Sequence, residues 1–398
     1  MNETATVIAT VSPSSPTIER SLMSLLFTPR AVGPLTLKNR IVVAPMCQYS
    51  AVDGVPQPWH AQHIGRLALS GAGLVVIEAT GVEAAGRISW ADTGLWNDEQ
   101  EAAFAKIIRD IRTYSDTPIG IQLGHAGRKA STNPPWIDRG GPAPADKAWE
   151  TFSASAQPFK ADWHTPTALD QAGMDRVVAA FVESAKRADR AGFDLVELHA
   201  AHGYLLTQFL SPLSNERTDE FGGSLENRMR FPLRVAQALR GAWPRTKALG
   251  VRFNGSDWTE GGITPDEAAV FGQALHAMGY DYLHLTSGGN VATARIPGDQ
   301  PNYQVAFAEA VKAATPEANV MAVGMIVSPQ QAEDLLTEGK ADLIAVARAV
   351  LDDPNWGHHA AVALGQPEGL PVQYERAGAA HWPGYATARA LADGSVAA

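Results

Sequence analysis

The strongest constraint on the fold is a repeat that runs from residue 41 almost to the end of the sequence. Short β-branched runs alternate eight times with longer stretches of helical periodicity, and polar or glycine-rich loops join them. The expected strands are Ile41–Met46, Leu74–Thr80, Ile119–Leu123, Leu195–His199, Leu249–Phe253, Tyr282–Ser287, Val320–Gly324 and Leu343–Ala347. The expected helices are Trp59–Ser70, Glu99–Tyr114, Met174–Ala191, Glu226–Trp243, Pro265–Met278, Tyr303–Ala314, Pro329–Glu338 and Asn355–Leu364. Eight strand–helix units close a parallel barrel, so the sequence predicts an α/β fold, the (β/α)8 TIM barrel.

A doubly wound parallel sheet is the competing architecture for alternating strands and helices. That sheet needs a reversal of strand order and usually carries a glycine-rich dinucleotide fingerprint after its first strand. Ile41–Ser50, which contains the first strand and the loop after it, lacks the fingerprint. The barrel is therefore the favoured architecture.

Three segments lie outside the repeat. Phe27–Leu37 has Gly33-Pro34 between apolar flanks and predicts an N-terminal hairpin that caps the bottom of the barrel. The connection after the third strand is rich in Pro, Gly and Trp and is far longer than an ordinary loop, so we expect it to cap the active-site mouth. The predicted units are a disordered extension over residues 1–24, a barrel domain over 25–370 with a capping insertion over 125–173, and a C-terminal tail over 371–398 that could serve as an intersubunit arm.

Composition excludes several classes of protein. The chain of 398 residues is 45% hydrophobic and 19% charged, as in an ordinary globular protein. Its net charge of −10 argues against nucleic acid or an anionic membrane surface as a partner. No apolar run reaches transmembrane length and no secretion signal is evident, so we expect a cytoplasmic protein. The single cysteine, Cys47, excludes an intrachain disulfide and a cysteine-ligated cluster, and no metal site is predicted.

A polar cluster follows the fourth expected strand. The apolar run Leu195–His199 stops in His199, His202 and Tyr204, with a turn-forming glycine at Gly203. Carboxyl ends of barrel strands carry the chemistry of barrel enzymes, and these side chains donate or exchange protons. The alternative is a helix start whose histidines bond to loop carbonyls.

The other strand ends test the barrel prediction. Small residues after the seventh and eighth strands, Gly324 and Ala347, stand with Arg348 in a pattern typical of a monophosphate site. Gln122 and Arg252 in the same mouth suit a flat heteroaromatic ring with several acceptors, such as a flavin. A structural ion pair inside the barrel is the alternative for Arg252.

At these residues the chain resembles the old yellow enzyme family of flavin-dependent ene reductases, in particular its bacterial, cysteine-bearing branch that includes the xenobiotic reductases. The resemblance covers about residues 25 to 376. Its motifs are Leu37–Arg40, Pro45–Cys47, Gly120–Leu123, His125–Lys129, His199–Tyr204, Ser214–Ser224, Glu226–Arg228 and Gln373–Arg376. All of them occur in this order along the chain of eight expected strands.

The resemblance implies bound FMN. Its phosphate would lie near Gly324, Ala347 and Arg348, although the family often has glycine where this chain has Ala347. Its ring would lie against Ala44, Pro45, Met46, Cys47, Ala79, Gln122 and Arg252. Arg252 would stabilise the anionic reduced ring.

The resemblance also implies a reaction. NADPH or NADH would pass hydride to the flavin, which would pass it to the β-carbon of an activated alkene. His199 and His202 would bind the alkene's carbonyl or nitro oxygen, helped by Tyr49, and polarise it. Tyr204 would protonate the α-carbon. Arg376 would reach the substrate pocket of a neighbouring subunit, which predicts a homodimer or a dimer-based oligomer.

Three alternatives remain open. A phosphate-binding barrel isomerase or aldolase would share the phosphate site, but it needs a central lysine or carboxylate, and no expected strand end offers one. A flavin-binding sensor without turnover would have no use for Tyr204 beside two histidines. A dienoyl-CoA or amine-dehydrogenase relative would add a cysteine cluster and a second nucleotide domain, which this sequence lacks.

Overall fold

The computed structural model, which describes residues 23–367 and 369–392, contains a closed barrel of eight parallel strands. The strands are β3 (Ile41–Val43), β4 (Leu74–Gly81), β5 (Ile119–Gly124), β8 (Leu195–Ala200), β9 (Ala248–Asn254), β10 (Tyr282–Thr286), β11 (Asn319–Ala322) and β12 (Leu343–Val346). They follow one another around the barrel in chain order, and β12 closes it by pairing with β3. The predicted (β/α)8 barrel is confirmed, and no strand reversal of a doubly wound sheet occurs.

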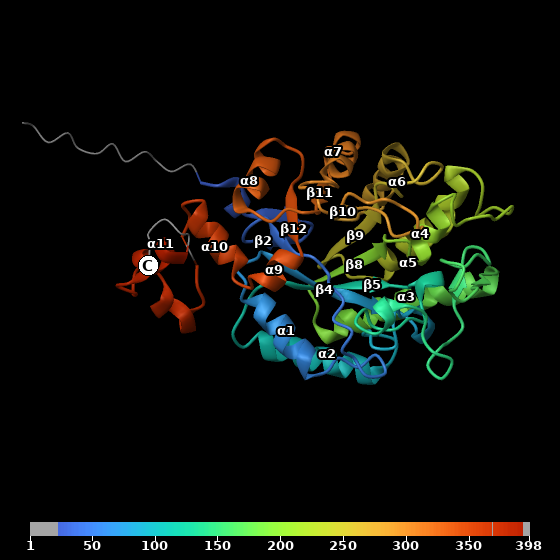
Figure 1. Ribbon diagram of the computed structural model, residues 1–398, viewed down its shortest axis with the longest axis horizontal. Coiled ribbons are helices and arrows are strands. Elements are labelled where there is room, and N and C mark those ends of the chain that lie inside the picture. Colours follow the sequence, from blue (N-terminus) through green and yellow to red (C-terminus); the bar gives the residue numbers. More distant parts are fainter. Residues whose placement is uncertain (1–22, 368, 393–398) are drawn as a thin grey trace, which may run out of the picture.

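An outer ring of helices covers the barrel (Figure 1). Its members are α1 (Pro58–Ala68), α2 (Asp98–Ile111), α3 (Gln171–Ala191), α5 (Leu225–Ala242), α6 (Pro265–Ala277), α7 (Val305–Ala314), α8 (Pro329–Thr337) and α10 (Trp356–Ala363). Local sequence explains where several begin: Thr264 and Ser328 cap α6 and α8, and each helix has proline at its first position. Two short helices, α4 (Leu205–Leu210) and α9 (Arg348–Asp352), follow β8 and β12 directly.

An antiparallel hairpin lies at the amino-terminal end of the barrel. Its strands are β1 (Arg30–Val32) and β2 (Leu35–Leu37). Val32 and Leu37 are fully buried and pack into a cluster with interior residues of the barrel strands. Gly33 makes the turn with a φ of +56°, and a Cβ there would lie 2.3 Å from the Asp281 carboxylate. The hairpin therefore closes one end of the barrel and leaves the other end for a site.

The long connection after β5 is held together by short elements. These are η3 (Gly127–Lys129), η4 (Asp138–Gly140), β6 (Phe152–Ser153) and β7 (Thr167–Ala168). Trp136, with 67% of its surface exposed, meets the ring of Tyr49 edge to face at a centroid distance of 5.9 Å. This contact brings the connection against the segment that follows β3.

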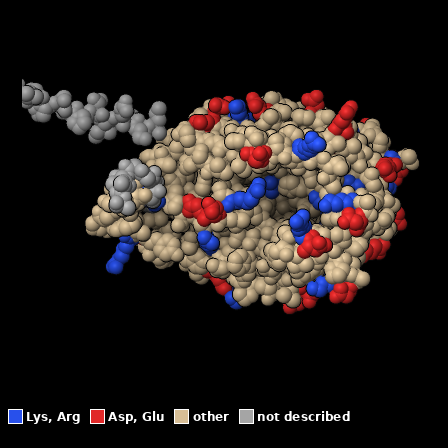
Figure 2. Space-filling view, in the orientation of Figure 1, with Lys and Arg blue, Asp and Glu red and all other residues tan. Residues whose placement is uncertain are grey.

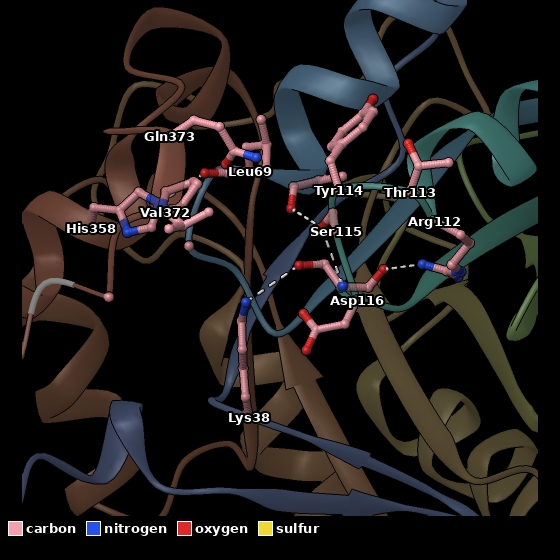
Figure 3. A pocket seen from close by; sticks show the side chains of 15 residues that line it. Lys38, Leu69, Arg112, Thr113, Tyr114, Ser115, Asp116, His358, Val372 and Gln373 are labelled. Carbon is pink, nitrogen blue, oxygen red and sulfur yellow. Dashed lines mark hydrogen bonds between the residues drawn. The ribbon is translucent and has the colours of Figure 1, made fainter. Parts of the chain in front are cut away.

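The chain ends in an exposed segment that contains η5 (Val372–Ala377) and α11 (Tyr385–Ala392). None of the η5 residues is buried. Gly369 and residues 371–373 line a cavity on the outside of the barrel together with the loop after α2 (Figure 3). The basic residues there are engaged, since Lys38 donates to Thr117 and Arg112 pairs with Asp194. Most of the N-terminal extension expected over residues 1–24 lies outside the described residues.

Candidate active site

The carboxyl ends of the later barrel strands enclose a cavity of about 260 Å³. Its lining includes His202, Arg252, Thr286, Ser287, Gln304, Gly324, Ala347 and Arg348. Figure 2 shows a hollow over the barrel strands with Lys and Arg side chains along its rim. The residues predicted for a phosphate and the arginine predicted for a ring thus line one cavity.

Backbone turns build the end of the cavity that contains Gly324. Gly324 has a φ of +120°, and a Cβ there would lie 2.8 Å from Gln304 Nε2. Both the backbone conformation and the available space therefore favour glycine. Ala347 has a φ of −115° and precedes Arg348, the first residue of α9. Because this φ is negative, alanine meets no left-handed backbone penalty where the resembling family often has glycine.

Arg252 is a buried cation on β9, with 7% of its surface exposed. Burial lowers its pKa, and the carboxylate of Glu197 acts in the opposite direction. Its Nε has no hydrogen-bond partner among the described residues. A buried cationic N–H without an acceptor is costly, so it suits a ligand with acceptors or negative charge.

A buried polar network lies at the centre of the barrel around Glu197. The Glu197 carboxylate accepts hydrogen bonds from Gln122 Nε2 at 2.7 Å and from the Tyr282 hydroxyl at 2.9 Å. His284 Nδ1 lies 2.9 Å from the same carboxylate. Burial alone would raise the pKa of Glu197, but His284, Arg252 and Tyr282 outweigh it and lower that pKa. Glu197 is therefore an ionised carboxylate whose hydrogen bonds are satisfied.

This network shows carboxylates at the barrel centre that lie within strands, where the prediction about strand ends does not apply. Glu197 lies within β8 and Glu78 within β4, and Lys129 follows β5. Glu78 accepts a hydrogen bond from the Gln48 backbone N–H and lies 3.3 Å from His60. These carboxylates lie inside strands that look apolar in sequence, so counting only strand ends missed them. Both carboxylates are engaged, so the structure offers neither as an unpaired base.

His199, His202 and Tyr204 are brought together as predicted. Their ring centroids lie 5.2 Å apart for the two histidines, 5.0 Å for His199 and Tyr204, and 6.4 Å for His202 and Tyr204. Each pair of rings is close to perpendicular. His199 lies on β8, and the other two follow it in a tight turn.

The turn after β8 depends on close backbone contact with the loop after β10. His202 has a φ of +59° and Gly203 a φ of +71°. A Cβ on Gly203 would lie 2.3 Å from the carbonyl oxygen of Gly289, and one on Gly289 would lie 2.5 Å from that of His202. Only glycine fits at both positions, and this approach sets where His202 and Tyr204 lie.

Both histidines are neutral at neutral pH. Burial, followed by the charge of Arg252, lowers the pKa of His199 to about 3 and that of His202 well below its usual range. His199 Nδ1 accepts a hydrogen bond from the Ala201 N–H, so the ring proton is on Nε2, which lies 3.4 Å from His202 Nδ1. His202 Nε2 lies 3.0 Å from Thr286 Oγ1, whose hydroxyl donates to Gln304. This chain fixes one tautomer for each histidine.

Burial also raises the pKa of the Tyr204 hydroxyl well above its usual range. Tyr204 therefore keeps its proton at neutral pH.

Asp92, close to Tyr204, is an acid that the sequence did not predict for the site. Its surface is 1% exposed. Burial raises its pKa to about 7, although Ser89 and Ile88 donate hydrogen bonds to its carboxylate.

The remaining predicted residues lie in three places. Ala44, Pro45, Met46, Cys47 and Tyr49 form the segment directly after β3, where the Ala44 N–H still bonds to the Val346 carbonyl. Ala79 and Gln122 are register partners on β4 and β5. Burial raises the pKa of Tyr49, with Cys47 and Tyr204 adding to the effect. Arg376 lies in η5, in the exposed C-terminal segment at the left of Figure 1, while the hollow of Figure 2 lies near the centre of the same view.

Residues 25–366 match the NADH:flavin oxidoreductase / NADH oxidase family. The chain belongs to this family. Members named NADPH dehydrogenase are similar over nearly their whole length: that of Geobacillus sp. (strain WCH70) is 40% identical over 358 residues, which are 89% of this chain and 98% of the relative. That of Bacillus subtilis (strain 168) is 40% identical over 354 residues, 88% of this chain and 98% of the relative.

A solved structure of morphinone reductase in complex with tetrahydroNAD is also similar, at 27% identity with a TM-score of 0.70. It covers 88% of this chain, and this chain covers 93% of it. The predicted membership in the old yellow enzyme family is therefore confirmed, while the cysteine-bearing branch stays a prediction. The protein is an FMN-dependent NAD(P)H oxidoreductase. No helix in the part of the chain that the structure describes is long and apolar enough to span a membrane.

The cavity fits the cofactor of this family. Arg348 and the backbone around Gly324 and Ala347 would hold the phosphate of FMN, because a guanidinium and backbone N–H groups grip such an anion. The unpartnered Nε of Arg252 would meet an acceptor of the ring.

Proposed function

We propose that this oxidoreductase reduces the carbon–carbon double bond of electron-poor alkenes such as enones, enals and nitroalkenes. The observation that carries the proposal is the cluster of two neutral imidazoles and one protonated phenol, within 6.4 Å of one another, beside the cavity that fits FMN. Bound FMN would supply the hydride carrier between the reduced nicotinamide and the β-carbon of the alkene.

The two histidines bind the substrate oxygen. Each neutral ring has one N–H, on His199 Nε2 and His202 Nε2, and these now face His202 Nδ1 and Thr286 Oγ1, so a bound substrate oxygen would take the place of these acceptors. A carbonyl or nitro oxygen at these rings accepts hydrogen bonds that strengthen as negative charge develops on it. Because burial keeps both rings neutral, they polarise the oxygen without protonating it.

Tyr204 delivers the proton to the α-carbon. Its raised pKa keeps the phenol protonated until the substrate carbanion develops beside it. Its ring lies 5.0 Å from that of His199, so oxygen binding and proton delivery occur within one small volume. Tyr49, whose pKa is raised by burial with smaller effects from Cys47 and Tyr204, adds a hydroxyl to this volume.

A second subunit completes the site through Arg376. In its own chain the arginine belongs to an exposed segment away from the central hollow. Val372 and Tyr374 in that segment are 74% and 54% exposed, and exposed apolar and aromatic side chains beside an arginine are typical of interface residues. The proposed assembly is a homodimer.

An anaerobic titration tests the proposed activity. NADPH added to the FMN-loaded protein should bleach the flavin absorbance, and cyclohexenone should restore it with formation of cyclohexanone. Cyclohexanone added instead of cyclohexenone is the control and should leave the flavin reduced. A flavin that NADPH reduces but cyclohexenone and nitroalkenes leave reduced would exclude alkene reduction while keeping the family assignment. It would also favour a flavin-binding sensor.

A further inference from the structure

Lys129 is a half-buried lysine that contacts both loops of the candidate active site. Its Nζ donates to the carbonyl oxygen of His202 at 2.7 Å and to that of Gly289 at 2.8 Å. These two carbonyls belong to the turn after β8 and to the loop after β10, the two backbones whose approach excludes a Cβ at Gly203 and Gly289. One ammonium group therefore joins the segments that position His202 and Tyr204.

The same ammonium lies between two aromatic faces. Lys129 Nζ is 4.9 Å from the ring centroid of Tyr204 and 4.9 Å from that of Phe159. Phe159 belongs to the long connection after β5, where it contacts Trp163 at a centroid distance of 4.9 Å. A cation at this distance from an aromatic face is attracted to its π electrons, and the attraction increases when the ring becomes an anion.

We infer that Lys129 is a positioning residue for proton transfer, which holds the phenol of Tyr204 in place and favours the loss of its proton. The inference rests on the proposed function, in which Tyr204 is the proton donor. When Tyr204 gives its proton to the α-carbon, the remaining phenolate lies against the Lys129 ammonium and its charge is stabilised. Lys129 itself gives no proton and forms no bond in the step. Solvent returns the proton to Tyr204 before the next turnover.

This role predicts a pH dependence. Burial lowers the pKa of Lys129 to about 7, with Arg128 and Lys160 adding to the effect. The charged and titratable groups that face it are Arg128 beside it, Lys160 in the connection, and His199, His202 and Tyr204 from β8 and its turn. Both histidines are neutral at this pH, whereas burial raises the pKa of Asp92, close to Tyr204, to about 7 as well, so the part of the pH profile that Lys129→Met removes is the part assigned to Lys129. Lys129 is charged below pH 7 and neutral above it, so the alkene step should slow as the pH rises through about 7.

The test is single-turnover kinetics of the two half-reactions in Lys129→Met, Lys129→Arg, Tyr204→Phe and the matched control Lys160→Met. Lys160 is an exposed lysine whose Nζ lies 5.7 Å from the centroid of the same Phe159 ring. Lys160→Met therefore removes a positive charge close to Lys129 and leaves the contacts of Lys129 in place. In Lys129→Met, reoxidation of the flavin by cyclohexenone should be slower by about 10- to 100-fold at pH 6.5, because the donor is misplaced. Flavin reduction by NADPH should change less than about threefold, because this half-reaction does not use the proton donor.

The pH profiles separate positioning from a merely structural role. Lys129→Met should lose the decline of the alkene step near pH 7, and Lys129→Arg, which stays charged, should keep a faster alkene step at pH 8.5 than Lys129→Met. Lys160→Met should keep the decline, moved to slightly higher pH because the charge of Lys160 helps to lower the pKa of Lys129. An alkene step in Lys129→Met within about twofold of wild type, or equal slowing of both half-reactions with loss of FMN, would overturn the inference. If Tyr204→Phe keeps the wild-type alkene step, the donor assignment itself fails; if Tyr204→Phe slows it and Lys129→Met does not, only the inference fails.

Discussion

Gln122 Nε2 donates a 2.7 Å hydrogen bond to the carboxylate of Glu197, so a neutral amide on β5 meets a buried anion on the neighbouring β8. Gln122 is among the residues that the family resemblance places against the flavin ring. The orientation of its amide is therefore set by the carboxylate of its register partner on β8. One hydrogen bond thus contributes to the stability of the barrel centre and also positions a side chain of the proposed flavin site.

Replacing Glu197 with glutamine should destabilise the protein in a pH-dependent way. Removing one partner of a buried charge network costs about 3 kcal/mol in the free energy of unfolding. The folded-state pKa of Glu197 is lowered, so the stabilisation is complete above the ordinary glutamate pKa of about 4.3 and is lost as the pH falls through the folded-state value. Urea unfolding at pH 7 and pH 4 should show a larger difference between wild type and variant at pH 7.

Glu183, a glutamate on α3 whose side chain is 57% exposed, provides the control for this measurement. Glu183→Gln should change the free energy of unfolding little at either pH. A Glu197→Gln protein as stable as wild type at pH 7 would show that the carboxylate is not needed in ionised form.

Arg348 and Arg252 should have separable roles. Replacing Arg348 with alanine removes a guanidinium from the predicted phosphate end, so the dissociation constant of FMN should rise by about 10- to 100-fold. Replacing Arg252 should chiefly slow flavin reduction, because the negative charge of the reduced ring loses its cation. Equilibrium dialysis and a reductive titration measure the two effects. Arg109→Ala, at an arginine whose side chain is 71% exposed on α2, is the control, and unchanged behaviour of both site variants would refute the assignment.

Tyr204→Phe should impair only one half of the reaction. Flavin reduction by NADPH should stay near the wild-type rate, while alkene reduction should slow by about 10²- to 10⁴-fold, as for a lost general acid. Stopped-flow measurements with several alkenes give both rates, since solvent can replace the donor for strongly activated substrates. Equal slowing of the two half-reactions would instead indicate lost flavin or misfolding.

Arg376→Ala should raise the apparent KM for the enone or the nicotinamide without changing the FMN content. Mixed with Tyr204→Phe, it should form heterodimers in which one site carries both lesions and the other neither, restoring up to about half of the activity of a wild-type pair. Glu375→Gln, in the same exposed segment, is the control. A strictly monomeric protein in sedimentation, or no recovery despite proven subunit exchange, would remove Arg376 from the site.

The barrel could be predicted because its signal is local and repeated. Each buried strand is a short apolar run, and capping residues such as Thr264 and Ser328 mark helix starts. Strand ends were less certain: β3 stops at Val43, three residues before the expected end, and Pro45 just beyond it has no N–H for a ladder. β11 likewise stops at Ala322, because the positive φ of Gly324 is not that of a strand.

The site could be predicted only where its residues follow strands directly. His199, His202 and Tyr204 are close in sequence, so their meeting follows from one turn. The carboxylate Glu197 lies inside an apolar run, and its partners Tyr282 and His284 come from a strand far along the chain. Lys129 belongs to a recognised motif, but its contacts with His202 and Gly289 depend on how two loops pack. Such pairings between distant segments cannot be read from one sequence.

Deuterium labelling of the product tests the proposed reaction most directly. Cyclohexenone should be reduced once with NADPH deuterated at both C4 positions in ordinary water, and once with unlabelled NADPH in D₂O. We expect deuterium at the β-carbon of cyclohexanone in the first experiment, because hydride travels from the nicotinamide through the flavin. We expect deuterium at the α-carbon in the second, because Tyr204 exchanges its proton with solvent. Consumption of the deuterated NADPH with no label at the β-carbon, or with the enone left unreduced, would contradict the proposed reaction.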